Sequence, residues 1–261
     1  MRALSFKRSV ALNNSHVLWV VIPARNEEEN IVACLDSFLD QTDNHFRIIV
    51  VDNGSTDRTK THVIDWIHYH PMIVVDIVNE SNPGIGRACR AGCKLALKSG
   101  AKILGRTDAD TLVDKNWVKE TRKSLIGGND FVAGRCMALP TERSFGLRLK
   151  STMLWVLVQL LVVRGRFRRG LPLSIVVMVG HNLALTAELY QVVGGFTILD
   201  VNEDVELHNR ILRRTRNGCY NPHMISYTSL RRIKEMGLIK TFLWYVRKQR
   251  HPRRRKHNRL G

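Results

Sequence analysis

The sequence VLWVVIPARNEEENI, residues 17–31, indicates the fold class. Its first seven residues form an apolar run that ends at Pro23, and such a short run is typical of a strand buried on both faces. A helix is expected next, over residues 26–41, with acidic residues in its first turn, where they suit the helix dipole. The apolar residues at helical spacing are Ile31, Leu35, Phe38 and Leu39.

The same alternation continues along the chain. Strands are predicted at residues 46–51, 72–78 and 102–110, and helices at residues 57–70 and 85–100. This alternation predicts an α/β fold in which an open, mostly parallel, Rossmann-like sheet has helices on both faces. We expect a basic N-terminal extension at residues 1–16, a single domain at 17–230 and a basic helix or tail at 231–261.

Composition limits the class of partner. The 261 residues are 44% hydrophobic, as expected of a protein that forms a core, and the net charge is +18. Such a charge favours an anionic partner, whether nucleic acid, phospholipid headgroups or a phosphorylated ligand. The excess is greatest over residues 231–259, which hold twelve Lys or Arg and one acid, Glu235.

The cysteines and the apolar segments bear on the compartment. Five scattered cysteines without a Cys-x-x-Cys pair favour reduced thiols in the cytosol over a disulfide framework or a zinc site. The basic N-terminus lacks a sustained apolar core, so we expect no signal peptide. Residues 153–163 are apolar but far shorter than the roughly 20 residues that span a bilayer.

Polar segments follow each of the four predicted strands. They are PARNEE (23–28), DNGSTD (52–57), NESNPGIGR (79–87) and TDADT (107–111). Ligands of open α/β sheets bind outside the carboxyl ends of the strands, so we expect these four loops to meet at one crevice. A turn and a helix cap explain residues 54–57 but leave Asp52 free to bind a base or ribose.

The glycine-rich loop before residue 88 is not a dinucleotide fingerprint. The third glycine of G-x-G-x-x-G would fall at Cys89, and the loop follows the third strand rather than the first. Gly84 and Gly86 are instead expected to let the backbone approach a phosphate at a helix start, where Arg87 adds positive charge.

Asp108 and Asp110 are separated by one residue, and two carboxylates so spaced repel unless something positive lies beside them. A solvated turn is the simplest explanation of an isolated pair. After a buried strand and near a Gly/Arg loop, however, the pair offers oxygen ligands to Mg²⁺ or Mn²⁺ held partly by a diphosphate. We therefore expect a divalent ion and a ribose to share the two acids.

Five segments in this order resemble the family-two glycosyltransferases of the GT-A fold, over residues 17–212. They are VVIPARNEEENI, VVDNGSTDRT, TDADT, GHNLALTAELYQVVGGF and NEDVELHNRI. The resemblance implies a catalytic domain that moves a sugar, with inversion, from a nucleotide-diphosphate sugar to an acceptor hydroxyl. A uridine donor is favoured, with guanosine as the alternative, and the cofactor is Mg²⁺ or Mn²⁺.

The resemblance also implies roles for individual residues. Asp110 binds the metal, Asp204 is the general base, and Glu203 stands beside it. Together with the Gly/Arg loop, the expected donor-binding residues are Pro23, Ala24, Arg25, Asn26, Glu27, Asp52, Gly86, Arg87 and Asp108. The expected sugar and acceptor pocket comprises Gly180, His181, Asn182, Gly195 and Glu203.

Simpler explanations exist for some of these residues. Periodicity alone would make residues 202–214 an amphipathic helix with an acidic first turn. His181, His208 and His223 each could ligate a metal, but single histidines more often serve packing or the surface, so none is assigned a metal here. The Q-x-x-R-W motif of processive relatives is missing, since no Trp follows Gln249, which favours addition of a single sugar.

Two apolar segments flanked by cations suggest a membrane surface. Residues 153–163 fit a headgroup-layer helix and a buried helix equally well. Residues 236–256 favour the membrane, because apolar and aromatic side chains adjoin a polybasic run. We therefore expect a peripheral enzyme at the cytoplasmic face of the membrane, whose basic tail meets anionic lipid and whose acceptor is a lipid or is linked to one.

Two other functions fit the sequence less well. A nucleic-acid-binding protein would explain the +18 charge, but not the carboxylates of the crevice, and the basic residues gather in the tail. No nucleic-acid partner is therefore expected. A nucleotidyltransferase of the same fold would carry a G-x-G-T-R segment near the N-terminus, where this chain has PARNEEE.

Overall fold

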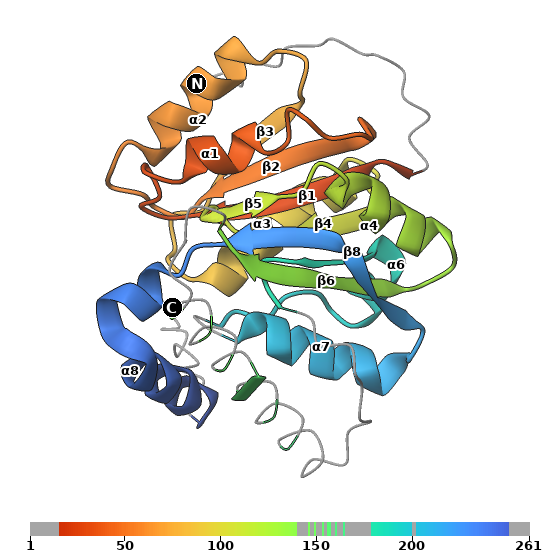
Figure 1. Cartoon of the computed structure of the whole chain (residues 1–261). Helices are drawn as coiled ribbons and strands as arrows, with labels where there is room; N and C mark the ends of the chain where they lie inside the picture. Colours follow the sequence, from red (N-terminus) through yellow and green to blue (C-terminus); the bar gives the residue numbers. More distant parts are fainter. Residues whose placement is uncertain are drawn as a thin grey trace, which may run out of the picture.

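The computed structural model describes residues 16–139, 179–199 and 202–250, with seven isolated positions between 146 and 164. Figure 1 shows the strands side by side in one curved sheet with helices against it. The first half comprises β1 (Leu18–Ala24), α1 (Ile31–Asp36), β2 (Phe46–Asp52), α2 (Thr59–Tyr69), β3 (Val75–Asn79), α3 (Ile85–Lys98), β4 (Ile103–Arg106), β5 (Thr111–Val113) and α4 (Trp117–Ile126). The second comprises β6 (Phe131–Ala138), β7 (Leu183–Thr186), α6 (Ala187–Val192), α7 (Glu203–Arg214), β8 (Gly218–Thr228) and α8 (Arg231–Arg250).

Within the described residues the strands form one eight-stranded sheet in the order β3-β2-β1-β4-β7-β6-β8-β5. β1 runs parallel to β2 and β4, and β2 runs parallel to β3. β7 is antiparallel to β4 and β6, whereas β8 is parallel to β6 and antiparallel to β5. The predicted α/β fold with a mostly parallel sheet is confirmed, and the antiparallel strands lie in its second half.

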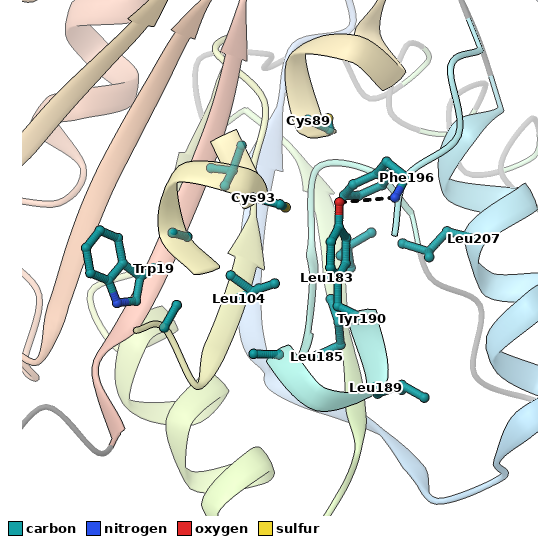
Figure 2. Close-up of a cluster of buried hydrophobic side chains, with 14 of the residues drawn as sticks. Trp19, Cys89, Cys93, Leu104, Leu183, Leu185, Leu189, Tyr190, Phe196 and Leu207 are labelled. Carbon is teal, nitrogen blue, oxygen red and sulfur yellow. Dashed lines mark hydrogen bonds between the residues drawn. The ribbon is translucent and has the colours of Figure 1, made fainter. Parts of the chain in front are cut away.

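The two faces of the sheet carry separate hydrophobic clusters, because successive side chains of a strand point to opposite sides. Trp19 and Val21 of β1 face α3, α6 and α7, as does Leu104 of β4. Figure 2 shows this cluster, in which Cys89 and Cys93 of α3 lie near the side chains of the later strands. Leu18 and Val20 of β1 face α1, α2 and α4 instead. Helices therefore cover both faces, as expected.

The predicted helix at residues 26–41 is wrong in its extent, since α1 covers only Ile31–Asp36. Asn26 has a φ of 54°, a left-handed conformation that a helix cannot contain, and residues 28–30 form a turn. The acids therefore precede the helix, and its first turn contains none. Leu39, expected in the core, has 42% of its surface exposed.

The C-terminal segment begins as α8 and is interrupted at Gly237, whose φ of 73° and ψ of 166° are not helical. The extension at residues 1–15 and the tail at 251–261 lie outside the described residues. Seven of the eleven residues of the apolar segment 153–163 do too. In the part of the chain that is described, no helix combines the length and apolarity needed to cross a membrane.

Candidate active site

The loops that follow β1 and β2 are tied together by hydrogen bonds. Asn26 Oδ1 accepts a hydrogen bond from the backbone N–H of Thr56 (2.8 Å), and the N–H of Asn26 donates to Ser55 Oγ (3.2 Å). The N–H of Glu27 donates to Thr59 Oγ1 (2.8 Å). Parallel pairing puts the carboxyl ends of these strands at one edge of the sheet, with Ala24 and Asp52 in register.

The loop after β3 joins them through Asn53, a residue to which the sequence assigned only a turn. Its Nδ2 donates to the carbonyl oxygens of Glu80 (3.0 Å) and Asn82 (2.8 Å), and its Oδ1 accepts from the N–H of Gly84 (2.8 Å). The preceding Asp52 is almost buried and accepts from the N–H of Ser55. Three of the predicted loops are therefore held next to one another.

A buried arginine at the end of β4 links two distant acids. Arg106 NH1 donates to Glu203 Oε1 (2.7 Å), and its Nε and NH2 donate to Asp108 Oδ1 (3.1 and 3.0 Å). Its guanidinium also lies 5.6 Å from the ring centre of Phe196, in the loop before α7. Arg106 was not among the residues predicted in the site, although a cation that ends a buried strand requires acidic partners.

Arg106 changes the explanation of the paired acids. Arg106 is the counter-charge of Asp108. A divalent ion and a ribose are therefore not needed to offset the negative charge of this carboxylate. Asp110 does not share that partner, and burial, followed by the charge of Asp108, raises its pKa above the ordinary value. Of the two carboxylates, Asp110 is therefore the one whose negative charge still lacks a bonded cation among the described residues.

The first turn of α7 places two acids on the other side of Arg106. Glu203 has only 3% of its surface exposed, and this burial raises its pKa to about 7, although the charge of Arg106 opposes the shift. Asp204 Oδ2 accepts a hydrogen bond from the backbone N–H of Gly180 (2.7 Å). A β-carbon at Gly180 would lie 2.7 Å from Arg106 NH2, so a side chain there would push against the guanidinium.

The turn at residues 179–182 is fixed by a buried asparagine. Asn182 Nδ2 donates to the carbonyl oxygens of Arg135 (2.9 Å) and Met224 (3.1 Å), and its Oδ1 accepts from the indole N–H of Trp117 (2.8 Å). These bonds join β6, β8 and α4. Asn182, predicted in the sugar and acceptor pocket, thus uses its side chain to hold the turn against these three elements.

Comparison with known proteins identifies the family to which this chain belongs. A model of the family described as glycosyl transferase family 2 matches residues 19–194. The chain belongs to glycosyl transferase family 2. That span runs from the second residue of β1 past the end of α6, and hence includes every predicted donor-binding residue, together with Asp110 and the turn at 179–182.

The curated relatives match part of this chain over part of their own length. The chain is 30% identical to chondroitin synthase of Escherichia coli over 121 residues, which are 45% of this chain and 17% of that protein. It is 32% identical to the UDP-N-acetylglucosamine–dolichyl-phosphate N-acetylglucosaminyltransferase of Methanococcus voltae over 138 residues, 48% of this chain and 54% of that one. The chain thus spans about half the length of these relatives, or less.

Among solved structures, a mannosyltransferase from Pyrobaculum calidifontis in complex with GDP-Man and Mn²⁺ has a TM-score of 0.59 and 22% identity, covering 88% of this chain and 64% of that one. Residues 1–349 of TarS from S. aureus in complex with UDP have a TM-score of 0.62 and 15% identity, with 88% and 65% covered. At these identities the likeness concerns the fold, and the predicted GT-A fold is confirmed.

The metal site that the resemblance implies can be compared with the side chains of the described residues. In residues 16–139, 179–199 and 202–250, no three or more His, Cys, Asp or Glu side chains are placed to hold a metal ion. Asp110 is nevertheless suited to a cation, since burial and Asp108 raise the pKa of its carboxyl group, and within the described part of the chain only Thr111 Oγ1 donates a hydrogen bond to that group (3.4 Å). A divalent ion here would need oxygens from the donor diphosphate, as Mg²⁺ and Mn²⁺ commonly do.

His181 and Cys136 adjoin the site. Burial alone would lower the pKa of His181, but the charge and hydrogen bonding of Cys136, with the charges of Asp108 and Asp110, raise it to about 9. The same contact lowers the pKa of the Cys136 thiol against the effect of its own burial. His181 is therefore within electrostatic range of both acids of the D-x-D segment.

Two predicted glycines have packing explanations. A β-carbon at Gly86 would lie 2.1 Å from the carbonyl oxygen of Thr197, and the N–H of Gly86 donates to Leu199 O (3.1 Å), so this amide does not point at a phosphate. Gly195 has a φ of 67°, and a β-carbon there would press on the ring of Tyr190. Figure 2 shows the N–H of Phe196 bonded to Tyr190 Oη (3.1 Å) in this region.

Hydrogen bonds and ion pairs connect some of the predicted site residues, whereas others make no such contact with them among the described residues. Arg106 and Gly180 connect Asp108, Glu203 and Asp204, and the first three loops are bonded to one another. Among the described residues, Arg25 and Arg87 form no ion pair or hydrogen bond with these carboxylates. Arg231, at the start of α8, was not predicted in the site, but its NH2 lies 3.2 Å from Glu27 Oε1.

Proposed function

We propose that this glycosyltransferase moves one sugar, with inversion, from a nucleotide-diphosphate sugar to an acceptor hydroxyl. The observation that carries the proposal is the bridge through Arg106, which binds Asp108 and also Glu203, a residue 97 positions further along the chain from Arg106. The bridge links Asp108, which follows β4, to the first turn of α7. Asp108, which would bind the donor, and Asp204, which would accept the proton, then belong to one site.

The donor would occupy the edge where the first three loops are bonded together. The segment Pro23–Glu27 and Asp52 would hold the base and ribose, and Asp108 the nucleoside side of the diphosphate. Asp110 would bind Mg²⁺ or Mn²⁺, which stabilises the charge of the departing diphosphate. Solved neighbours in complex with UDP or with GDP-Man and Mn²⁺ support a donor of this class, with UDP favoured.

Asp204 would act as the general base. The acceptor oxygen forms a bond to the anomeric carbon from the face opposite the diphosphate, while the bond from that carbon to the diphosphate oxygen breaks. The electrons of the broken bond leave with the diphosphate, and the acceptor proton moves to Asp204. The N–H of Gly180 orients this carboxylate, and a carboxylate oxygen that accepts one hydrogen bond keeps a second lone pair for the acceptor hydroxyl.

The acceptor is proposed to be a lipid, or to be linked to one, at the cytoplasmic face of a membrane. The name of the Methanococcus voltae relative includes dolichyl phosphate, which is a lipid. Exposed apolar side chains support a membrane surface: Leu149, Met153, Val156, Leu157 and Leu160, and on α8 Ile239 and Leu243. The first five recur at helical spacing, on one face of a helix, next to Arg164 in the sequence.

The catalytic proposal is tested with a panel of nucleotide sugars, with and without Mn²⁺ or Mg²⁺. One donor is expected to raise the melting temperature only when the divalent ion is present. Asp110→Asn should remove that effect, Asp204→Asn should keep it but lose transfer, and Asp65→Asn, an exposed acid on α2, should change neither. Equal stabilisation by the donor in excess chelator would contradict the role of Asp110.

The membrane proposal has its own test. The full chain should float with vesicles that contain anionic phosphatidylserine at low salt, and detach as salt is raised, because exposed charges are screened. Neutral phosphatidylcholine vesicles are the control. Failure to bind anionic vesicles at low salt would remove the membrane surface from the proposal and leave sugar transfer intact.

A further inference from the structure

We propose that Arg106 is a positioning residue for the reaction: it holds the segments on both sides of Asp204, and so fixes the carboxylate of the base before the donor binds. The inference rests on the proposed function, because Asp204 is the base assigned there. It goes further in two respects. Arg106 acts on the reaction without touching either substrate, and Glu203 acts through Arg106 instead of lining the sugar pocket.

The first contact of Arg106 is with the residue next to the base. Arg106 NH1 donates to Glu203 Oε1 (2.7 Å), and the two side chains are only 3% and 5% exposed. Asn202, which precedes Glu203, has a φ of 59°, and a residue other than glycine keeps such a left-handed backbone only where its surroundings hold it. The buried ion pair therefore fixes the start of α7, and with it the backbone of Asp204.

The second contact is with the turn that bonds to the base. The N–H of Gly180 donates to Asp204 Oδ2 (2.7 Å). A β-carbon on Gly180 would lie 2.7–3.1 Å from NH2, Cζ and NH1 of Arg106, so the backbone of this glycine lies directly against the guanidinium. Arg106 thus supports the N–H group that orients the base, on the side opposite to the ion pair.

The third contact sets the base relative to the donor. Arg106 Nε and NH2 both donate to Asp108 Oδ1 (3.1 and 3.0 Å), so the donor can bind the other oxygen of this carboxylate. A guanidinium is planar and holds its N–H groups at fixed angles, which fixes the carboxylates of Asp108 and Glu203 relative to each other. One side chain therefore determines how the donor-binding acid and the base-bearing turn are spaced.

Burial and permanent charge make this arrangement independent of substrate. Arginine stays protonated in proteins, so the two carboxylates are held when the site is empty. Glu203 has 3% of its surface exposed, which closes its carboxylate off from a sugar ring and leaves it the role of holding Arg106. Such positioning matters for rate, because a displacement of about 1 Å in a reacting group can cost about a hundred-fold.

The first readout is the amide signal of Gly180 in proton–nitrogen correlation spectra of the isotope-labelled full chain. An N–H that donates to a carboxylate has a proton resonance shifted downfield, so this signal reports where the Asp204 carboxylate lies. Asp204→Asn removes the charged acceptor and defines the displacement to be expected. Arg106→Lys and Glu203→Gln should move the signal in the same direction, although both leave Asp204 in place.

The matched control is Arg122→Gln, which also breaks an arginine–aspartate ion pair. Arg122 is paired with Asp43, which precedes β2, and donates to the carbonyl oxygen of His16, which precedes β1. It therefore lies at the ends of these strands opposite the site loops. This substitution should leave the Gly180 signal where it is, so a general loss of stability is separated from a loss of positioning.

The second readout separates turnover from donor binding. The assay is hydrolysis of the donor that the panel of nucleotide sugars identifies, in which water replaces the acceptor and gives its proton to the same base. Glu203→Gln keeps the contact of Arg106 with Asp108, so the Kd of the donor should not change. The kcat should fall about ten-fold or more, because the base is displaced. Arg122→Gln should change neither quantity.

The outcomes distinguish this inference from the proposed function. Donor hydrolysis by wild type, with the Gly180 signal unmoved in Arg106→Lys and Glu203→Gln, would overturn the inference alone. An unchanged kcat in Glu203→Gln, or a weaker Kd with unchanged kcat, would do the same. Should Arg106→Lys not fold, Glu203→Gln, which is close to the native residue in shape, decides both readouts. No hydrolysis of any donor by wild type would overturn the proposed function and this inference with it.

Discussion

Arg106→Met tests the bridge between the two halves of the site. The side chain of Arg106 is 3% exposed, as against 5% for Glu203 and 28% for Asp108. Methionine fills a similar volume but leaves Glu203 buried without a counter-charge. Breaking a buried ion pair in this way costs about 3–5 kcal/mol, and Asp108 adds less because water reaches it.

The loss should depend on pH. Burial raises the folded-state pKa of Glu203 to about 7, from an ordinary value of 4.5, and Arg106 opposes that shift, so its removal raises the pKa further. A carboxyl group with a raised pKa binds its proton more tightly in the folded state, so it lowers stability as pH rises from 4.5 through the folded-state pKa. The penalty of Arg106→Met should therefore be smaller at pH 5.5 than at pH 8.

Urea denaturation at pH 5.5, 7 and 8 measures the free energy of unfolding, and the melting temperature at pH 7 should fall by about 6–20 °C for a chain of this size. Arg106→Met/Glu203→Gln should recover part of the loss, because the uncompensated carboxylate is gone. Arg106→Lys should be intermediate, since an ammonium cannot bridge two carboxylates as the planar guanidinium does. A penalty below about 1 kcal/mol, or one of equal size at pH 5.5 and 8, would refute the bridge.

Three further substitutions test the packing around the site. Gly86→Ala should cost about 1–3 kcal/mol of unfolding free energy in urea titration, because the new β-carbon meets Thr197 O, whereas Gly146→Ala, which has no described atom within 4 Å of its β-carbon, should cost nothing. Asn53→Ala should cost about 1–3 kcal/mol and weaken binding of UDP or GDP, measured by calorimetry; unchanged stability would show that the loops after β2 and β3 do not depend on it. Asn182→Ala leaves the indole N–H of Trp117 buried without an acceptor, so a loss of about 1–3 kcal/mol is expected in thermal unfolding, and a loss below that range would contradict this role.

Sequence patterns predicted most of the first half of the fold. The apolar runs that became β1 and β2 agree with the strands to within one residue at each end, because a strand buried on both faces needs a continuous apolar segment. The start of α3 at Ile85 was also predicted. The helix after β1 was not, since the acids of residues 27–29 match a helix start by composition, whereas Asn26 and the bonds to the loop after β2 hold them in a turn.

The sequence by itself determined the family, the order of strands and helices in the first half of the chain and the acids that could do the chemistry, because these depend on local periodicity and short segments. Only the tertiary structure decided which cation accompanies Asp108, that Gly86 is packed under residues 197–199, and that Asn182 fixes the turn before β7. The partners of Arg106 and Asn182 are up to 97 residues away in sequence. Such contacts depend on how the strands and helices pack, and no local pattern records them.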